Sequence, residues 1–84
     1  MNIYERSKLA RAGFEIRNNI AEQTGVFNII VRKNENENGN ETFDVTMKLS
    51  ESNYYKYDPT INSKTLNNVS FNKVLSFLGI WHLN

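Results

Sequence analysis

Two alternating apolar segments on either side of a polar run constrain the fold of this chain most strongly. Val26–Val31 and Phe43–Leu49 place apolar side chains at every second position over most of their length. That spacing is the period of a β-strand with one face toward a core. The run between them, Asn34–Glu41, is polar and contains a single glycine, Gly39. This order predicts a β-hairpin with a long, hydrated loop.

Two features of this hairpin bear on function. Ile30 interrupts the polar side of the first strand, so we expect that strand to be central and covered on part of both sides. The loop carries three carboxylates with nothing nearby to raise their pKa, and we interpret them as solvated loop charge. The alternative is a functional acidic tip made of Glu35, Glu37 and Glu41.

The segment from Tyr4 to Gln23 predicts a first helix that ends before Gly25. One apolar strip along it contains Leu9, Ala12, Ile16 and Ile20, and a second contains Ile3, Ala10, Phe14 and Ala21. Arg6 and Arg17 separate the two strips. Either both strips are buried between the sheet and the C-terminal segment, or Phe14, Arg6 and Arg17 face a partner, since aromatic and Arg side chains are enriched at interfaces.

The second half of the chain predicts one more strand and a second helix. Asn53–Tyr57 has high strand propensity and is cut off by Asp58 and Pro59. Residues 60–68 are mostly polar and indicate a packed loop. Phe71, Val74, Leu75 and Leu78 then recur at helical spacing, with Asn68 or Ser70 as N-cap and Gly79 as terminator.

These elements predict a single α+β domain over residues 1–84. An N-terminal helix, a three-stranded antiparallel meander and a C-terminal helix would form two layers, with helices on one face of the sheet. At 84 residues the chain is long enough for one domain and too short for two.

The residue inventory argues against catalysis. The chain has no cysteine, and its only histidine is His82, so no metal set or activated nucleophile is expected. The four glycines are widely separated and form no phosphate-binding loop. We predict a protein that is not an enzyme and needs no cofactor or metal.

Charge and hydropathy limit the possible surroundings and partners. The formal net charge of +1 does not indicate a strongly basic nucleic-acid binder. No stretch approaches the roughly 18 apolar residues of a membrane span, and the N-terminus lacks the apolar region of a secretion signal. We expect a complete, intracellular protein in the cytoplasm of a bacterial host cell, without membrane contact.

Aromatic residues supply the best candidate binding surface. Strand aromatics with an interleaved lysine can stack on bases or form a protein contact, which points to Tyr54, Tyr55, Lys56 and Tyr57. The alternative is that one pair packs in the core and the other caps a sheet edge. Trp81 is either an exposed hot spot or a docking plug against the second helix.

Two families resemble parts of the sequence. The predicted order of helix, three strands and helix resembles the double-stranded-RNA-binding domain, although only Lys64 and Lys73 stand where that family has a lysine-rich motif. The stretches 44–47 and 54–57, with Leu49 and loosely Phe71 to Leu75, resemble the small uracil-DNA glycosylase inhibitors of Bacillus phages. The second resemblance implies a short, cofactor-free phage protein that blocks a nucleic-acid enzyme by covering its surface. Anti-CRISPR proteins are similar in size and in lacking catalytic motifs.

The leading hypothesis is therefore a non-enzymatic inhibitor or adaptor, encoded by a phage or mobile element. Its partner would be a bacterial nuclease, effector or other protein that processes nucleic acid or serves defence. One alternative is a small RNA- or DNA-binding module that uses Tyr54 to Tyr57 with Lys48, Lys56 and Arg32. Another is an assembly component of a virion or conjugation apparatus. A homodimer is also plausible, because an open sheet edge or face is readily covered by a second copy.

Overall fold

The computed structural model describes residues 1–35, 39, 41–50 and 63–80. These residues form two helices and five strands. The elements in chain order are α1 (Ile3–Arg11), β1 (Glu15–Arg17), β2 (Ile20–Gln23), β3 (Phe27–Asn34), β4 (Thr42–Leu49), β5 (Ser63–Val69) and α2 (Phe71–Leu78).

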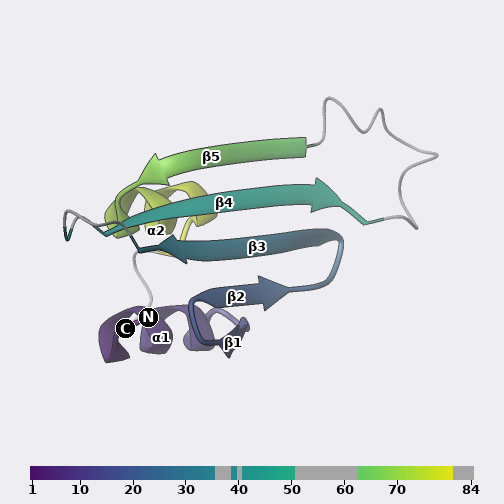
Figure 1. The fold of residues 1–84 in the computed structure, drawn as a ribbon. Coiled ribbons are helices and arrows are strands. Elements are labelled where there is room, and N and C mark those ends of the chain that lie inside the picture. The colour runs from purple at the N-terminus through teal and green to yellow at the C-terminus, as the bar shows by residue number, and fades with distance from the viewer. Residues whose placement is uncertain (36–38, 40, 51–62, 81–84) are drawn as a thin grey trace.

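The five strands form one antiparallel sheet in which spatial order equals chain order, from β1 at one edge to β5 at the other. Both helices lie on the same side of this sheet (Figure 1). Leu9 of α1 and Val74 of α2 are fully buried with Val31, Phe43 and Val45 of the central strands. The fold is thus α+β with helices on one sheet face, as predicted. We call the opposite side of the sheet the open face.

The prediction of one long helix from Tyr4 to Gln23 is wrong in its second half. α1 ends at Arg11, and the remainder forms a tight hairpin, β1 and β2, joined through Asn18 and Asn19. Asn18 takes φ 53, a left-handed conformation that asparagine tolerates and that a helix cannot contain. The apolar residues of this stretch fit the period of a helix, and they fit two short strands joined by a two-residue turn equally well. The structure contains the two strands and the turn.

The described residues form a sheet of five strands, where three strands were predicted. Two of the additional strands come from the hairpin of β1 and β2. The strand that follows β4 is Ser63–Val69, which lies in the stretch interpreted as a packed loop. The predicted strand Asn53–Tyr57 lies outside the described residues. The second helix is confirmed: the Ser70 side chain accepts from Lys73 N, and Gly79 closes the helix at φ 71.

A buried ion pair joins α1 to the β3–β4 hairpin. Lys33 Nζ lies 3.0 Å from Glu5 Oε1 and 3.2 Å from Glu41 Oε2. Glu5 is only 4% exposed and also accepts from the backbone N–H of Asn2, which closes a capping box at the helix start. Burial of the Lys33 ammonium opposes its charge, but the hydrogen bonds to Glu5 and Glu41 outweigh it and raise the pKa of Lys33. This cluster fixes the position of α1 against the sheet.

Gly13 is required by the turn between α1 and β1. It has φ 92, and a Cβ there would lie 2.9 Å from Nε2 of Gln23, whose amide donates to the carbonyl of Ala12. Gly13→Ala is expected to lower the free energy of unfolding by about 1–2 kcal/mol, through backbone strain and loss of that hydrogen bond. Gly25→Ala is the matched control, because its Cβ would meet nothing closer than 3.9 Å. Equal urea midpoints for the two variants would contradict this assignment.

Candidate functional site

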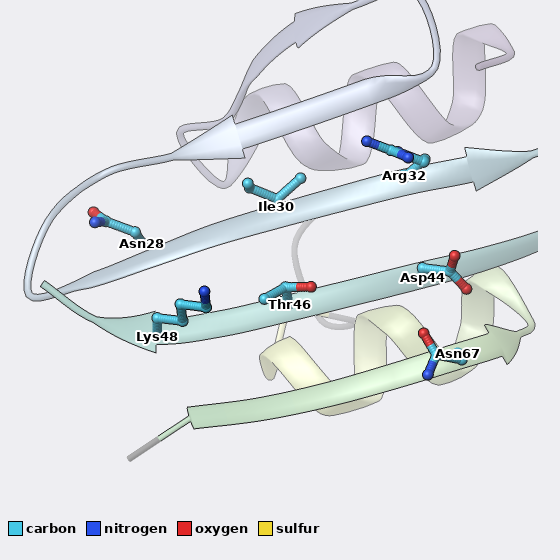
Figure 2. Close-up of a pocket in the computed structure, with 7 residues that line it drawn as sticks. All are labelled: Asn28, Ile30, Arg32, Asp44, Thr46, Lys48 and Asn67. Carbon is cyan, nitrogen blue, oxygen red and sulfur yellow. The ribbon is translucent and has the colours of Figure 1, made fainter. Parts of the chain in front are cut away.

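A shallow depression lies on the open face of the sheet. It has a volume of about 330 Å³, and its lining side chains come from three adjacent strands. Figure 2 shows these side chains on the side of the sheet away from both helices. They are Asn28, Ile30 and Arg32 of β3, Asp44, Thr46 and Lys48 of β4, and Asn67 of β5.

Strand alternation places these residues together. Arg32 pairs with Asp44, Ile30 with Thr46, and Asn28 with Lys48, so each pair projects from the same face of two neighbouring strands. The intervening residues, such as Val31 and Val45, project into the core. The depression is therefore the solvent side of the hairpin whose other side builds the core.

Ile30 lies midway along the β3 side of the depression, between Asn28 and Arg32 (Figure 2). β3 is the middle strand of the sheet, so the expectation that this strand is central is confirmed. The expectation that it is covered on both sides is not met at Ile30, whose side chain is 42% exposed. Ile30 is thus an exposed apolar side chain, and the other residues that line the depression are all polar or charged.

The charged side chains around Ile30 differ in whether they have a partner. Asp44 Oδ1 accepts a hydrogen bond from the backbone N–H of Asn68 at 2.9 Å, where β5 contains a bulge. The structure forms no ion pair between Arg32 or Lys48 and any carboxylate among the described residues. Arg32 and Lys48 lie on opposite sides of Ile30 along the strand direction (Figure 2). Arg32 and Lys48, which both have unused hydrogen-bonding capacity, therefore lie on either side of the apolar side chain of Ile30.

The open face becomes acidic toward β1. Glu15 and Glu22 are directly paired across β1 and β2, and with Arg17 and Ile20 they line a second hollow of about 210 Å³. Like charges placed directly opposite each other on neighbouring strands repel each other. The open face as a whole carries both signs of charge and forms no basic stripe.

The structure separates the residues of the first predicted partner surface. Phe14 is 7% exposed and belongs to the core, so it is not available to a partner. Arg6 is on α1, where its Nε donates to the carbonyl of Met1 at 2.9 Å. Arg17 is on β1 and projects from the open face. The proposed grouping of Phe14, Arg6 and Arg17 fails because the helix that would have aligned them ends at Arg11.

The other predicted site residues fall into two groups. Tyr54, Tyr55, Lys56, Tyr57, Trp81 and Glu37 lie outside the described residues. Glu35 accepts from Asn19 Nδ2 at 2.9 Å, and Glu41 pairs with Lys33. In the described part of the loop the carboxylates thus hold structural contacts.

Sequence reasoning noted Ile30, Arg32 and Lys48 but missed their association with Asp44, Thr46 and Asn67. The alternation within the two strands was a sufficient signal for Asp44 and Thr46. Asn67 could not be found, because its segment was interpreted as a loop and its bulged register is not visible in the residue pattern.

Nothing in the described residues suggests a metal centre or a membrane span. These ranges hold no group of three or more His, Cys, Asp and Glu side chains placed to bind a metal ion. No helix within them has the length and apolar character needed to cross a bilayer. Comparisons with protein-family models, with curated proteins and with solved structures found no significant match.

Proposed function

We propose that this chain is a small non-enzymatic binding protein that docks a protein partner on its open face. The observation that carries the proposal is the arrangement around Ile30: an exposed apolar side chain beside the amides of Asn28 and Asn67, the hydroxyl of Thr46 and the cations Arg32 and Lys48, which form no ion pair with the described carboxylates. An apolar centre within a polar rim is the usual anatomy of a protein interface. The depression is open and shallow, whereas a site for a small molecule is usually a deeper cleft that buries most of the ligand.

Charge favours a protein over a nucleic acid as the partner. The described residues of the open face include the carboxylates of Glu15, Glu22 and Asp44 beside the cations, and none of them is aromatic. Binding to phosphates needs an excess of positive charge, and binding to single strands usually adds aromatic stacking. A partner surface with carboxylates placed opposite Arg32 and Lys48 fits these charges better.

For the class of partner, the proposal follows the sequence resemblance to small phage inhibitors. The chain would act as an inhibitor encoded by a phage or mobile element, and it would cover the surface of a bacterial nucleic-acid-processing or defence protein.

Affinity capture with matched variants tests the open face. The tagged wild-type chain is expected to retain a stoichiometric protein from bacterial lysate, whereas Ile30→Glu and Arg32→Glu should weaken that capture at least tenfold, as for central interface residues. Arg11→Glu on the exposed side of α1 is the control and should leave capture unchanged. Retention of the same protein by all three variants would exclude the open face as the binding surface.

Salt distinguishes the partner classes in the same experiment. Capture through a protein interface with two charge contacts should weaken less between 50 and 200 mM salt than phosphate binding through six or more contacts, which falls by about 10³-fold or more over that range. Recovery of nucleic acid with a steep salt dependence would contradict a protein partner.

A further inference from the structure

β5 contains a bulge at the border of the open-face depression. Val45 pairs with Leu66, and Phe43 pairs with Val69, so the pairing advances by two residues on β4 and by three on β5. Leu66 and Val69 both pack against the core, although residues three apart in a regular strand point to opposite faces. The extra residue is Asn68 at φ 56, a left-handed conformation that asparagine tolerates. It brings both apolar side chains to the same face.

The bulge also supplies a hydrogen-bond donor to Asp44. Asn67 and Asn68 together stand opposite Asp44, which is the β4 residue at the register shift. The backbone N–H of Asn68 donates to Oδ1 of Asp44 at 2.9 Å, and the Asn67 side chain lines the same depression as Asp44. A hydrogen bond to an ionised carboxylate is stronger than one between neutral groups. Asp44 is therefore held toward β5.

Asp44 is also the residue with which Arg32 would be expected to pair. The two face each other in register on β4 and β3, and opposite charges in such positions attract each other. The structure forms no ion pair between them, and in Figure 2 their side chains extend in different directions. The exposed guanidinium of Arg32 thus keeps its fork of N–H donors, which can bind a carboxylate through two parallel hydrogen bonds.

We infer that the bulge is a positioning device of the open face: it ties Asp44 to β5, so that Arg32 binds a carboxylate of the partner instead of Asp44. This inference rests on the proposed function and deepens it, because it specifies which charge of the open face contacts the partner. The charge of Asp44 stays near Arg32 and repels the same carboxylate, so removing that charge should strengthen binding. A cation of the partner placed on Asp44 would give the opposite result.

Asp44→Asn tests this assignment by the sign of its effect. Asparagine keeps an oxygen that can accept from Asn68 N, so the bulge is retained while the charge is removed. The protein that the wild type retains from lysate serves as the ligand in a titration. Asp44→Asn should lower the dissociation constant about two- to fivefold, as for an exposed charge pair. Glu35→Gln is the matched control and should have no effect, because it changes the net charge equally, does not line the depression and still accepts from Asn19.

Deleting Asn68 tests the bulge itself. The deletion leaves Leu66 and Val69 two positions apart, so a regular strand still directs both toward the core. Asp44 loses the N–H of Asn68 and should then pair with Arg32, which raises the dissociation constant about two- to fivefold. Asn68→Gly is the control and should bind as the wild type does, because glycine keeps the N–H and readily adopts the left-handed conformation. Equal binding by the deletion and by Asn68→Gly, or weaker binding by Asp44→Asn, overturns the inference.

A double-mutant cycle gives a readout that needs no partner. While the bulge holds Asp44 away from Arg32, the changes in urea midpoint caused by Arg32→Gln and Asp44→Asn should add in the double variant. In the background of the Asn68 deletion the same changes should not add, because the two side chains then pair. Non-additive changes in the otherwise wild-type chain would contradict the inference. If the wild type retains no protein, the proposed function is wrong, whereas the cycle still decides whether the bulge separates Asp44 from Arg32.

Discussion

Phe14→Ala is expected to lower the free energy of unfolding by about 3–5 kcal/mol, the largest effect we predict for a single substitution. Phe14 is 7% exposed and packs in the same cluster as Leu9 and Ala21. Truncating a buried phenylalanine removes its apolar contacts and leaves a cavity that the surrounding residues fill only in part. A domain of this size has a total stability of roughly 4–13 kcal/mol, so the substitution is expected to remove about a quarter of that stability or more. Urea denaturation followed by circular dichroism measures the change.

Phe27→Ala provides the matched control for this substitution. The residue change is identical, but Phe27 is 37% exposed at the start of β3, so the loss should stay near 1–2 kcal/mol. If Phe14→Ala unfolds no more easily than Phe27→Ala, then Phe14 does not lie in the core, and the sequence-based alternative of a partner-facing Phe14 would be restored.

Lys33→Met is expected to destabilise the fold by about 2–4 kcal/mol. The substitution keeps an unbranched side chain but leaves the carboxylate of Glu5 buried without its cation. Removing one partner of a buried ion pair costs more than removing both, because the remaining charge is left uncompensated. The double variant Glu5→Gln with Lys33→Met should therefore recover most of the loss, since glutamine is neutral and still accepts from Asn2 N in the capping box. A double variant less stable than Lys33→Met alone would contradict this account.

The same ion pair predicts a specific alkaline sensitivity. Hydrogen bonds to Glu5 and Glu41 raise the pKa of Lys33 above 10.5, the value expected when the chain is unfolded. A raised pKa contributes stability that is fully present below pH 10.5 and is lost as the pH rises through the folded-state value. The free energy of unfolding of the wild type should fall more steeply above pH 10.5 than that of Lys33→Met. Parallel curves for the two proteins would show that Lys33 does not contribute in this way.

The correct parts of the sequence prediction rest on signals that have one interpretation. In β4, strict alternation from Phe43 to Leu49 fits only a strand with one buried face, and the structure confirms it. In α2, Ser70 and Gly79 supply start and stop signals at the ends of an apolar helical period, and both function as predicted. In these elements the local sequence preferences and the tertiary packing favour the same structure, so the residue pattern is enough to predict it.

The incorrect parts come from segments where one pattern allows two structures. Ile16 and Ile20 continue the helical strip of Leu9, yet with Asn18 in a left-handed conformation they belong to a hairpin. β5 has little apolar alternation, because an edge strand buries only Leu66 and Val69, and those only in part. Its strand character comes from backbone pairing with β4, which the side chains hardly indicate.

The candidate site, like the fold, could be predicted from the sequence only in part. The parity of β3 and β4 was sufficient to place Ile30, Arg32 and Lys48 on one face. The sequence could not show that the backbone N–H of Asn68 donates a hydrogen bond to the carboxylate of Asp44. In the structure Arg32 forms no ion pair with a carboxylate of the described residues, although Asp44 lies directly across from it on β4. Which charged side chains pair across the strands is therefore visible only in the three-dimensional structure.

Because every strand of the sheet pairs with the strand before it, the fold can assemble in the order of synthesis. Each new strand needs only its immediate predecessor, and sheets built from such sequence-local pairs form faster than those with crossovers. At every stage the newest strand is the growing edge, and Lys33 can reach Glu5 only once β3 has been added. Among the described strands β5 is the last to be added, so its outer side corresponds to the side on which each earlier strand received the next one.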